Sequence, residues 1–281
     1  MSLNRVLRRT MTVTAALAAG AAACLLVPSS ASAGANADNT GSAGNAVALP
    51  PVHAGFDYQI GGAYTPPSGV KVVSRDHGAS PASGLYNICY VNAFQAQPGA
   101  EGEWDDDLLL RDGNGDVVYD GDWGEAVLDI RTADKRQRIA AKVGAWINSC
   151  ADKGFQAVEP DNYDTFTRFS SYLTAGQAKA YISLLADRAH GRGLAIAQKN
   201  TGELAGAGKE TGLDFAVVEE CGAYDECGDF TAEYGNHVVV VEYTASGLRK
   251  ACAQWGSALS IVRRDVGVSP AGSSGYVRQT C

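Results

Sequence analysis

The chain has 281 residues, 46% of them hydrophobic and 19% charged, and its formal net charge at pH 7 is −8. An acidic protein of this kind does not suit a nucleic-acid partner, because the phosphates would repel it. It suits a neutral or cationic substrate, which a negative cleft would concentrate, although acidity also keeps exported proteins soluble without any further role.

Residues 1–33 have the pattern of a secretory signal peptide. Three arginines near the start precede an apolar run over residues 13–27, and the small-x-small cleavage site Ala31-Ser32-Ala33 follows it. The run is short for a membrane span, and no second run approaches that length. We therefore expect a secreted, extracellular protein outside any membrane. Removal of the three arginines takes the net charge from −8 to −11.

Residues 34–54 are rich in glycine, alanine, asparagine and proline, and we interpret them as a flexible linker. Residues 55–281 have a globular composition and the size of one (β/α)8 barrel, about 200–250 residues. Short apolar or alternating segments in this range predict eight strands. They are Phe56–Ile60, Val70–Arg75, Leu85–Asn92, Phe155–Pro160, Leu194–Gln198, Asp214–Glu219, Val238–Glu242 and Ala258–Arg263.

Helical patterns lie between the later strands. Residues 133–150 place their apolar side chains on one stripe, and Thr174-x-x-Gln177 is a capping box for a helix that stops near residues 191–193. Strands that alternate with helices form parallel βα units, and eight of them favour a single-domain α/β fold, the (β/α)8 TIM barrel. The alternative is an open, doubly wound sheet. Its glycine fingerprint is absent, because Thr211 stands where the third glycine belongs.

The stretch between the third strand and the helix at residue 133 is unusually long for a loop of a barrel. Its segment Asp112-Gly-Asn-Gly-Asp116 resembles a calcium loop at first sight. However, Val117 sits where the sharp-turn glycine belongs, and Trp123 sits where the bidentate glutamate belongs. The segment therefore favours a β-hairpin turn, and this stretch could form one wall of a substrate groove.

Six cysteines lie outside the signal peptide, and an even number in an exported chain indicates disulfides. Six cysteines allow fifteen pairings. A metal site is disfavoured, because there is no Cys-x2-Cys pair and no histidine nearby. The spacing favours three pairs. Cys221–Cys227 would close a short loop, Cys252–Cys281 would tie down the C-terminus, and Cys89–Cys150 is the pair that remains.

Carboxylates gather near the predicted strand ends, where barrels of this type build their active sites. Glu159 and Asp161 share parity on the fourth strand, so their side chains point the same way. Glu219 shares the apolar face of the sixth strand, whereas Glu220 points away. Lys199 ends the fifth strand, where its cation could hold a carboxylate ionised. A carboxyl pair is what glycoside hydrolysis requires, although any single acid could instead be a cap or an ion-pair partner.

A set of motifs runs along residues 56–281. They are Phe56-Asp-Tyr-Gln-Ile-Gly61, Tyr86-Asn-Ile-Cys-Tyr-Val-Asn-Ala-Phe94, Val158-Glu-Pro-Asp-Asn162, Ala197-Gln-Lys-Asn200, Val218-Glu-Glu-Cys-Gly222 and Tyr224-Asp-Glu-Cys227. Together they resemble glycoside hydrolase family 114, the endo-α-1,4-polygalactosaminidase family. The resemblance implies a barrel that cleaves α-1,4-linked galactosamine polymers internally, without a cofactor. Unacetylated galactosamine is cationic, which agrees with the acidic chain.

The resemblance carries the catalytic roles to Asp161 and Glu219. We assign Asp161 as nucleophile and Glu219 as general acid/base, and the order of the two roles stays open. We expect a monomer whose partner is a cationic extracellular polysaccharide. The candidates for the surrounding substrate subsites are Asp57, Asp76, Tyr90, Asn92, Glu159, Asn162, Lys199, Glu220, Glu242 and Tyr243.

Three other functions compete with this hypothesis. A barrel that binds polysaccharide without cutting it would show affinity but no shortening of the polymer, and the intact carboxylates argue against it. A hydrolase acting on a related hexosamine polymer would share the same fold. A metal-dependent deacetylase would lose activity with a chelator, and the scattered histidines disfavour it.

Overall fold

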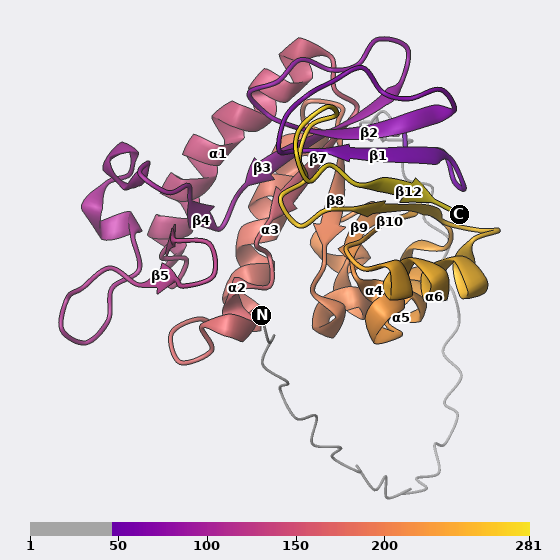
Figure 1. The fold of residues 1–281 in the computed structure, drawn as a ribbon. Coiled ribbons are helices and arrows are strands. Elements are labelled where there is room, and N and C mark those ends of the chain that lie inside the picture. The colour runs from indigo at the N-terminus through magenta and orange to yellow at the C-terminus, as the bar shows by residue number, and fades with distance from the viewer. Residues whose placement is uncertain (1–46) are drawn as a thin grey trace, which may run out of the picture. The chain divides into compact units, whose positions relative to one another are not determined.

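A sheet of parallel strands curls around a common axis in residues 47–281, the part of the chain that the computed structural model describes (Figure 1). Each of the eight predicted strands is present, and the TIM barrel is confirmed. Neighbours in the sheet follow the order of the chain. The parallel strands are β1 (Gly55–Gln59), β2 (Val70–Asp76), β3 (Tyr86–Asn92), β7 (Ala157–Asp161), β8 (Ala195–Lys199), β9 (Phe215–Glu219), β10 (Val238–Glu242) and β11 (Ser260–Arg264).

The barrel is nearly closed where its first and last strands meet. A ninth strand, β12 (Arg278–Thr280), pairs antiparallel with β11. Its Arg278 donates a hydrogen bond from Nη2 to the backbone oxygen of Phe56 on β1, 3.1 Å away. Phe56 also shares one apolar cluster with Val262 of β11. The C-terminal strand therefore helps to join the two edges of the sheet.

Helices cover the outside of the barrel from β3 onward, whereas loops make the β1–β2 and β2–β3 connections. The expected capping box is present, because Thr174 and Gln177 bond each other's backbone N–H groups. Short 3-10 helices span residues 101–103, 106–108, 202–207 and 209–211. The α-helices are α1 (Ala133–Lys153), α2 (Thr165–Arg168), α3 (Ala175–His190), α4 (Cys221–Tyr224), α5 (Cys227–Tyr234) and α6 (Ala245–Trp255).

Two apolar layers divide the side chains of the barrel strands. Alternate residues such as Tyr58 and Val217 fill the barrel interior. The residues between them, such as Val91 and Ile196, pack outward with helix residues such as Leu185. Because successive side chains of a strand point to opposite faces, strand parity decides whether a polar residue reaches the barrel interior or the helix layer.

An insertion between β3 and α1 forms a small antiparallel sheet of β4 (Gln95–Ala96), β5 (Tyr119–Asp120) and β6 (Glu125–Val127), in the order β4-β6-β5 (Figure 1). The hairpin turn expected at residues 112–116 is confirmed, since the Asp112 amide donates to the Asp116 carbonyl over 2.9 Å. The insertion therefore adds a second sheet beside the barrel.

Residues 47–54 pack against the barrel, so the folded domain begins earlier than the linker predicted over residues 34–54 allows. Val47 and Leu49 contact the cluster that fills the barrel interior. The Ala48 carbonyl accepts a hydrogen bond from the Tyr86 hydroxyl, and the Ala54 amide donates to Ser260 Oγ. Tyr86 and Ser260 begin strands, so this segment covers the amino ends of the barrel strands. The rest of the predicted linker and the signal peptide lie outside the described residues.

Three disulfides cross-link the domain, and all three favoured pairings are confirmed. Cys89–Cys150 joins β3 to α1, Cys221–Cys227 joins the starts of α4 and α5, and Cys252–Cys281 ties α6 to the end of the chain. Within residues 47–281, no helix is both long and apolar enough to cross a membrane.

Candidate active site

The ammonium group of Lys199 is buried at the carboxyl end of the barrel strands, and only 1% of its side chain is exposed. Its Nζ lies 3.0 Å from Asp161 Oδ1 and 3.1 Å from Glu159 Oε1. Glu219 Oε2 lies 3.5 Å from the same atom. All four residues share the inward parity of β7, β8 and β9, which the strand pattern predicted for the three acids. A buried cation is tolerated because these carboxylates compensate its charge.

Glu159 is enclosed beneath this group. The Tyr58 hydroxyl donates to its Oε1 over 2.7 Å, and Ser74 Oγ donates to its Oε2 over 2.6 Å. Burial raises the pKa of Glu159, and the charge of Lys199 opposes that rise. Because both oxygens are engaged and the side chain is fully buried, Glu159 holds Lys199 in place. The structure thus corrects the expectation that Glu159 itself contacts substrate.

Asp161 lies at the open end of the site, with 19% of its side chain exposed. The Tyr90 hydroxyl donates to Oδ2 over 2.6 Å, and Lys199 donates to Oδ1 over 3.0 Å. Burial alone would raise the pKa of Asp161, but the Lys199 ammonium and the Tyr90 hydrogen bond outweigh it and hold the pKa below its ordinary value. Asp161 is therefore an ionised carboxylate at neutral pH, the form that a nucleophile needs.

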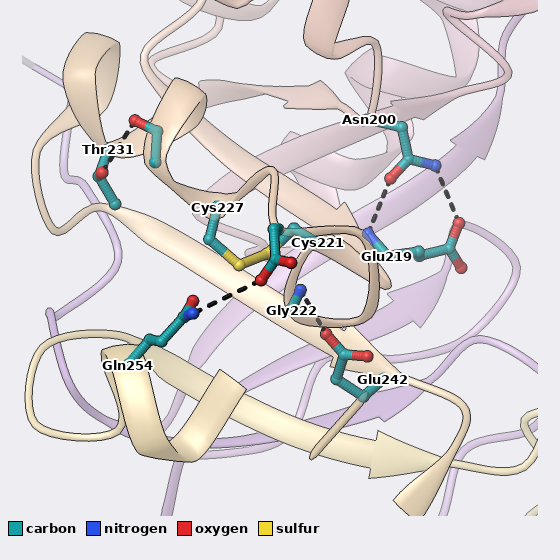
Figure 2. Close-up of a disulfide and its surroundings, with 10 residues drawn as sticks. Asn200, Glu219, Cys221, Gly222, Cys227, Thr231, Glu242 and Gln254 are labelled. Atoms are coloured by element: carbon teal, nitrogen blue, oxygen red, sulfur yellow. Dashed lines mark hydrogen bonds between the residues drawn. A yellow bond between two sulfur atoms is a disulfide. The ribbon is translucent and has the colours of Figure 1, made fainter. Parts of the chain in front are cut away.

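Glu219 is the second carboxylate that reaches solvent, with 24% of its side chain exposed. Asn200 clamps it from both sides, because Asn200 Nδ2 donates to Glu219 Oε2 over 3.0 Å and Asn200 Oδ1 accepts from the Glu219 amide (Figure 2). The Tyr243 hydroxyl donates to Oε1. Each catalytic candidate thus has its own tyrosine, Tyr90 for Asp161 and Tyr243 for Glu219.

The separation of the two acids is limited by the lysine that they share. Asp161 Oδ1 and Glu219 Oε2 both contact Lys199 Nζ, so they can be no farther apart than the sum of 3.0 Å and 3.5 Å. Both carboxylates therefore border the same space at the barrel mouth. A single glycosidic linkage fits between carboxyl groups at such a distance.

A polar rim borders Asp161 on the side of β3. Asn162, whose φ is 66°, donates from Nδ2 to Asn92 Oδ1 over 3.0 Å and to Glu125 Oε2 over 3.3 Å. Asn92 is the register partner of Asp161 in the β3–β7 pair. Asn92 and Asn162 were predicted near the site from their strand ends and motifs, whereas Glu125 was not predicted. This acid belongs to β6 of the insertion, where no strand parity of the barrel points to it.

Two predicted subsite residues lie elsewhere and are corrected. Asp57 alternates with the inward-facing Tyr58 and is fully buried on the other side of β1. Glu242 alternates with Val241 and is fully buried outside the barrel, where its Oε1 accepts a hydrogen bond from the Gly222 amide (Figure 2). Neither acid can therefore contact the substrate directly.

Two further candidates stay at the barrel mouth without joining the Lys199 group. Asp76 ends β2 beside Tyr90, its register partner, and its Oδ1 accepts from the Gly78 amide. Glu220 follows Glu219 in a left-handed turn with φ 59°, and it is partly exposed. Both remain predictions for outer subsites.

Three residues that support the pair were also not predicted as site residues: Tyr58, Ser74 and Asn200. A signal existed for each of them, since Tyr58 and Ser74 share the inward parity of their strands and Asn200 follows Lys199 directly. Among residues 47–281, no group of three or more histidine, cysteine, aspartate or glutamate side chains is arranged to ligate a metal ion. The cation at the centre of this site is that of Lys199.

Comparison with known families identifies the family of the chain. The sequence model of glycoside-hydrolase family GH114 matches residues 36–281. The chain belongs to this family. It is accordingly a glycosidase, an enzyme that hydrolyses glycosidic bonds. No curated protein sequence matches the chain significantly.

Solved structures share the fold. Ega3 of Aspergillus fumigatus, solved in complex with galactosamine, superposes with a TM-score of 0.67 at 23% identity, over 83% of this chain and 97% of that one. The glycoside hydrolase domain of PelA from Pseudomonas aeruginosa gives a TM-score of 0.52 at 14% identity, over 78% and 97% of the two chains. At these identities the likeness concerns the fold.

Proposed function

We propose that this glycosidase cleaves α-1,4-linked, galactosamine-rich polysaccharide at internal bonds, with Asp161 and Glu219 as its catalytic pair. The observation that carries the proposal is the convergence of both carboxylates on Lys199 at the barrel mouth. The acidic chain suits a cationic polymer. The fold shared with Ega3, which was solved with galactosamine, supports the same substrate class.

In the proposed reaction, Asp161 attacks the anomeric carbon while Glu219 gives its proton to the departing glycosidic oxygen. The C1–O bond breaks, and an ester forms between C1 and Asp161. Glu219, now a carboxylate, takes a proton from a water molecule whose oxygen attacks C1. The ester bond then breaks, so Asp161 leaves as a carboxylate and Glu219 is protonated again.

Two features support this order of roles and a retaining reaction. The Lys199 ammonium and the Tyr90 hydroxyl hold the pKa of Asp161 below its ordinary value despite burial, which suits a nucleophile. The shared lysine keeps the two carboxylates close. Retaining glycosidases place their carboxyl groups about 5–5.5 Å apart, whereas inverting ones need about 6.5–9.5 Å to admit a water molecule.

The first test is cleavage of a defined α-1,4-galactosamine polymer, with products sized by mass spectrometry. We expect Asp161→Asn and Glu219→Gln each to lower kcat by roughly a thousandfold or more. Asp229→Asn is the matched control, because this exposed acid lies outside the site. A ladder of intermediate lengths indicates internal cleavage. Wild-type protein that binds the polymer without shortening it would instead make the barrel a binding protein.

The order of the roles has a separate test. On a substrate whose leaving group needs no proton, Glu219→Gln should recover much of its activity, whereas Asp161→Asn should not. If the reaction retains configuration, NMR should show the α-anomer as the first product. A first product of β configuration would mean inversion and would remove Asp161 as nucleophile.

We also propose that the enzyme works outside the cell. Three disulfides suit an oxidising compartment. Export predicts a mature protein in the culture medium that begins after Ala33, and the intact mass of the secreted protein measures this directly.

A further inference from the structure

Glu125 is a buried acid without a cation. It begins β6 and is only 9% exposed. The donor at its Oε2 is the neutral amide of Asn162, 3.3 Å away, and no lysine or arginine within residues 47–281 forms an ion pair with it. Burial raises the pKa of Glu125, the nearby Asp161 and Asp120 raise it further, and the neutral side-chain amides of Asn92 and Asn162 oppose the rise. A buried carboxylate in this state is costly unless something brings it a positive charge.

Asn92 supplies an unsatisfied donor at the same place. Its side chain is 5% exposed, and its Oδ1 accepts from Asn162 Nδ2 over 3.0 Å. Its Nδ2 lies toward Glu125 yet meets no acceptor at hydrogen-bond distance and angle within the described residues. A buried donor without an acceptor destabilises the fold, so each such group calls for an explanation.

The position of these two groups places them beside Asp161, the proposed nucleophile. Asn92 is the register partner of Asp161, and Asn162 follows Asp161 and bonds both Asn92 and Glu125. The three acids around Lys199 already share a cation, and that cation would repel a second one. A positively charged substituent of the substrate is therefore favoured at Glu125, whose carboxylate has no lysine or arginine partner within the described residues.

We propose that Glu125 and Asn92 form an amine-reading subsite, in which the Glu125 carboxylate binds the ammonium group of a hexosamine and Asn92 Nδ2 donates to a hydroxyl oxygen of the same sugar. This inference rests on the proposed function and adds the residue that distinguishes an amino sugar from a neutral one. An amine next to a hydroxyl matches this arrangement, a carboxylate without a cation beside a donor without an acceptor.

The decisive variant is Glu125→Gln, which removes the charge but keeps the size and an oxygen for Asn162. Calorimetric titration with galactosamine and with galactose tests it without any cleavage, because the two sugars differ at C2 by the amine. We expect wild-type protein to bind galactosamine about tenfold more tightly or better, and Glu125→Gln to bind the two sugars alike. Asp116→Asn is the matched control, since it removes an exposed acid from the same insertion.

Stability separates this role from a structural one. Removal of an uncompensated buried acid should leave the thermal midpoint of Glu125→Gln unchanged or raise it, since binding groups are often held at a cost to stability. In cleavage assays the KM for the galactosamine polymer should rise about tenfold, with a much smaller change on the acetylated polymer, which lacks the charge.

Three results would overturn the subsite: equal binding of both sugars by the wild type, a sugar preference that survives in Glu125→Gln, or a lowered midpoint with unchanged affinity. Failure of the proposed function looks different. In that case the wild type leaves the polymer intact, and the sugar titrations still report whether Glu125 reads the amine.

Discussion

Two clusters of buried charged residues lie on opposite sides of the barrel wall, and they differ in how far their acids remain accessible to solvent. The cluster around Lys199 fills the barrel mouth with inward-facing acids. The cluster around Asp57 lies on the other side of β1, where Asp57 Oδ1 is 3.2 Å from Arg278 Nε and 3.7 Å from Arg264 Nη1. Tyr64 and Gln59 add hydrogen bonds to the same carboxylate.

The difference is one of charge balance and of access. Around Lys199 the acids outnumber the cation, and Asp161 and Glu219 keep part of their side chains in solvent. Around Asp57 the arginines outnumber the acid, and the carboxylate is fully buried. A buried acid surrounded by the protein's own cations joins parts of the fold, in this case β1 to β12. An acid whose charge is only partly balanced by a shared cation, and whose side chain reaches solvent, is available to a substrate.

Removal of the central cation should have the largest effect. Lys199→Met leaves three acids uncompensated, so we expect it to lower the free energy of unfolding by about 3–5 kcal/mol, measured by chemical denaturation. Lys199 holds the pKa of Asp161 down, and Asp161 must be ionised to attack. The acidic limb of the kcat/KM profile should therefore move to higher pH, and activity at neutral pH should fall.

Glu159→Gln is the control for this test, because it should shift the acidic limb of the kcat/KM profile in the opposite direction. It removes an acid from Lys199 and a like charge from the neighbourhood of Asp161. The pKa of Asp161 should then fall further, and the acidic limb should move to lower pH, opposite to the shift in Lys199→Met. Shifts in the same direction for both variants would show that the limb reports a group other than Asp161.

The Asp57 cluster should respond in stability alone. Asp57→Asn removes the partner of Arg278 while keeping the size of the side chain, and we expect the free energy of unfolding to fall by about 2 kcal/mol. Because Asp57 faces away from the barrel mouth, kcat per folded molecule should stay near the wild-type value. The comparison of the two clusters breaks down if Asp57→Asn folds normally but loses activity as Asp161→Asn does.

Strand parity explains how much of the site the sequence predicted. Because alternate side chains of β7 and β9 face the barrel interior, Glu159, Asp161 and Glu219 were predicted to border the same space. The structure brings all three to Lys199. The same rule, applied to every strand, separates Asp57 and Glu242 from the site, since each alternates with an inward-facing neighbour. These two became candidates through strand-end position and motif, which do not report the face of a strand.

The remaining parts of the site depend on tertiary contacts. Glu125 approaches Asp161 because the small sheet of the insertion packs at the β3–β7 rim, which no periodicity along the chain encodes. The burial of Glu159 depends on Tyr58 and Ser74, which lie on strands distant in the sequence. The fold itself was predictable, because eight strands, two long helices and the spacing of the cysteines are local signals.

The smallest effect is expected at an exposed ion pair, which serves as a baseline for both clusters. His190 Nε2 lies 2.9 Å from Asp214 Oδ2, and 37% of the His190 side chain is exposed. The hydrogen bond with Asp214 raises the pKa of His190 against the opposing effect of burial. Exposure and screening keep such a pair to about 0.5 kcal/mol.

The sign of its pH dependence follows from the raised pKa. The folded-state pKa of His190 lies above its unfolded value of about 6.5, so the pair contributes fully below that pH and is lost as the pH rises through the folded pKa. The stability difference between wild type and His190→Gln should therefore be largest near pH 5 and should shrink as the pH rises, with kcat unchanged throughout. A difference that grew with pH would mean that His190 is bound in its neutral form. In that case its bond to Asp214 would be a neutral hydrogen bond, and the baseline would no longer measure what an exposed charge pair contributes.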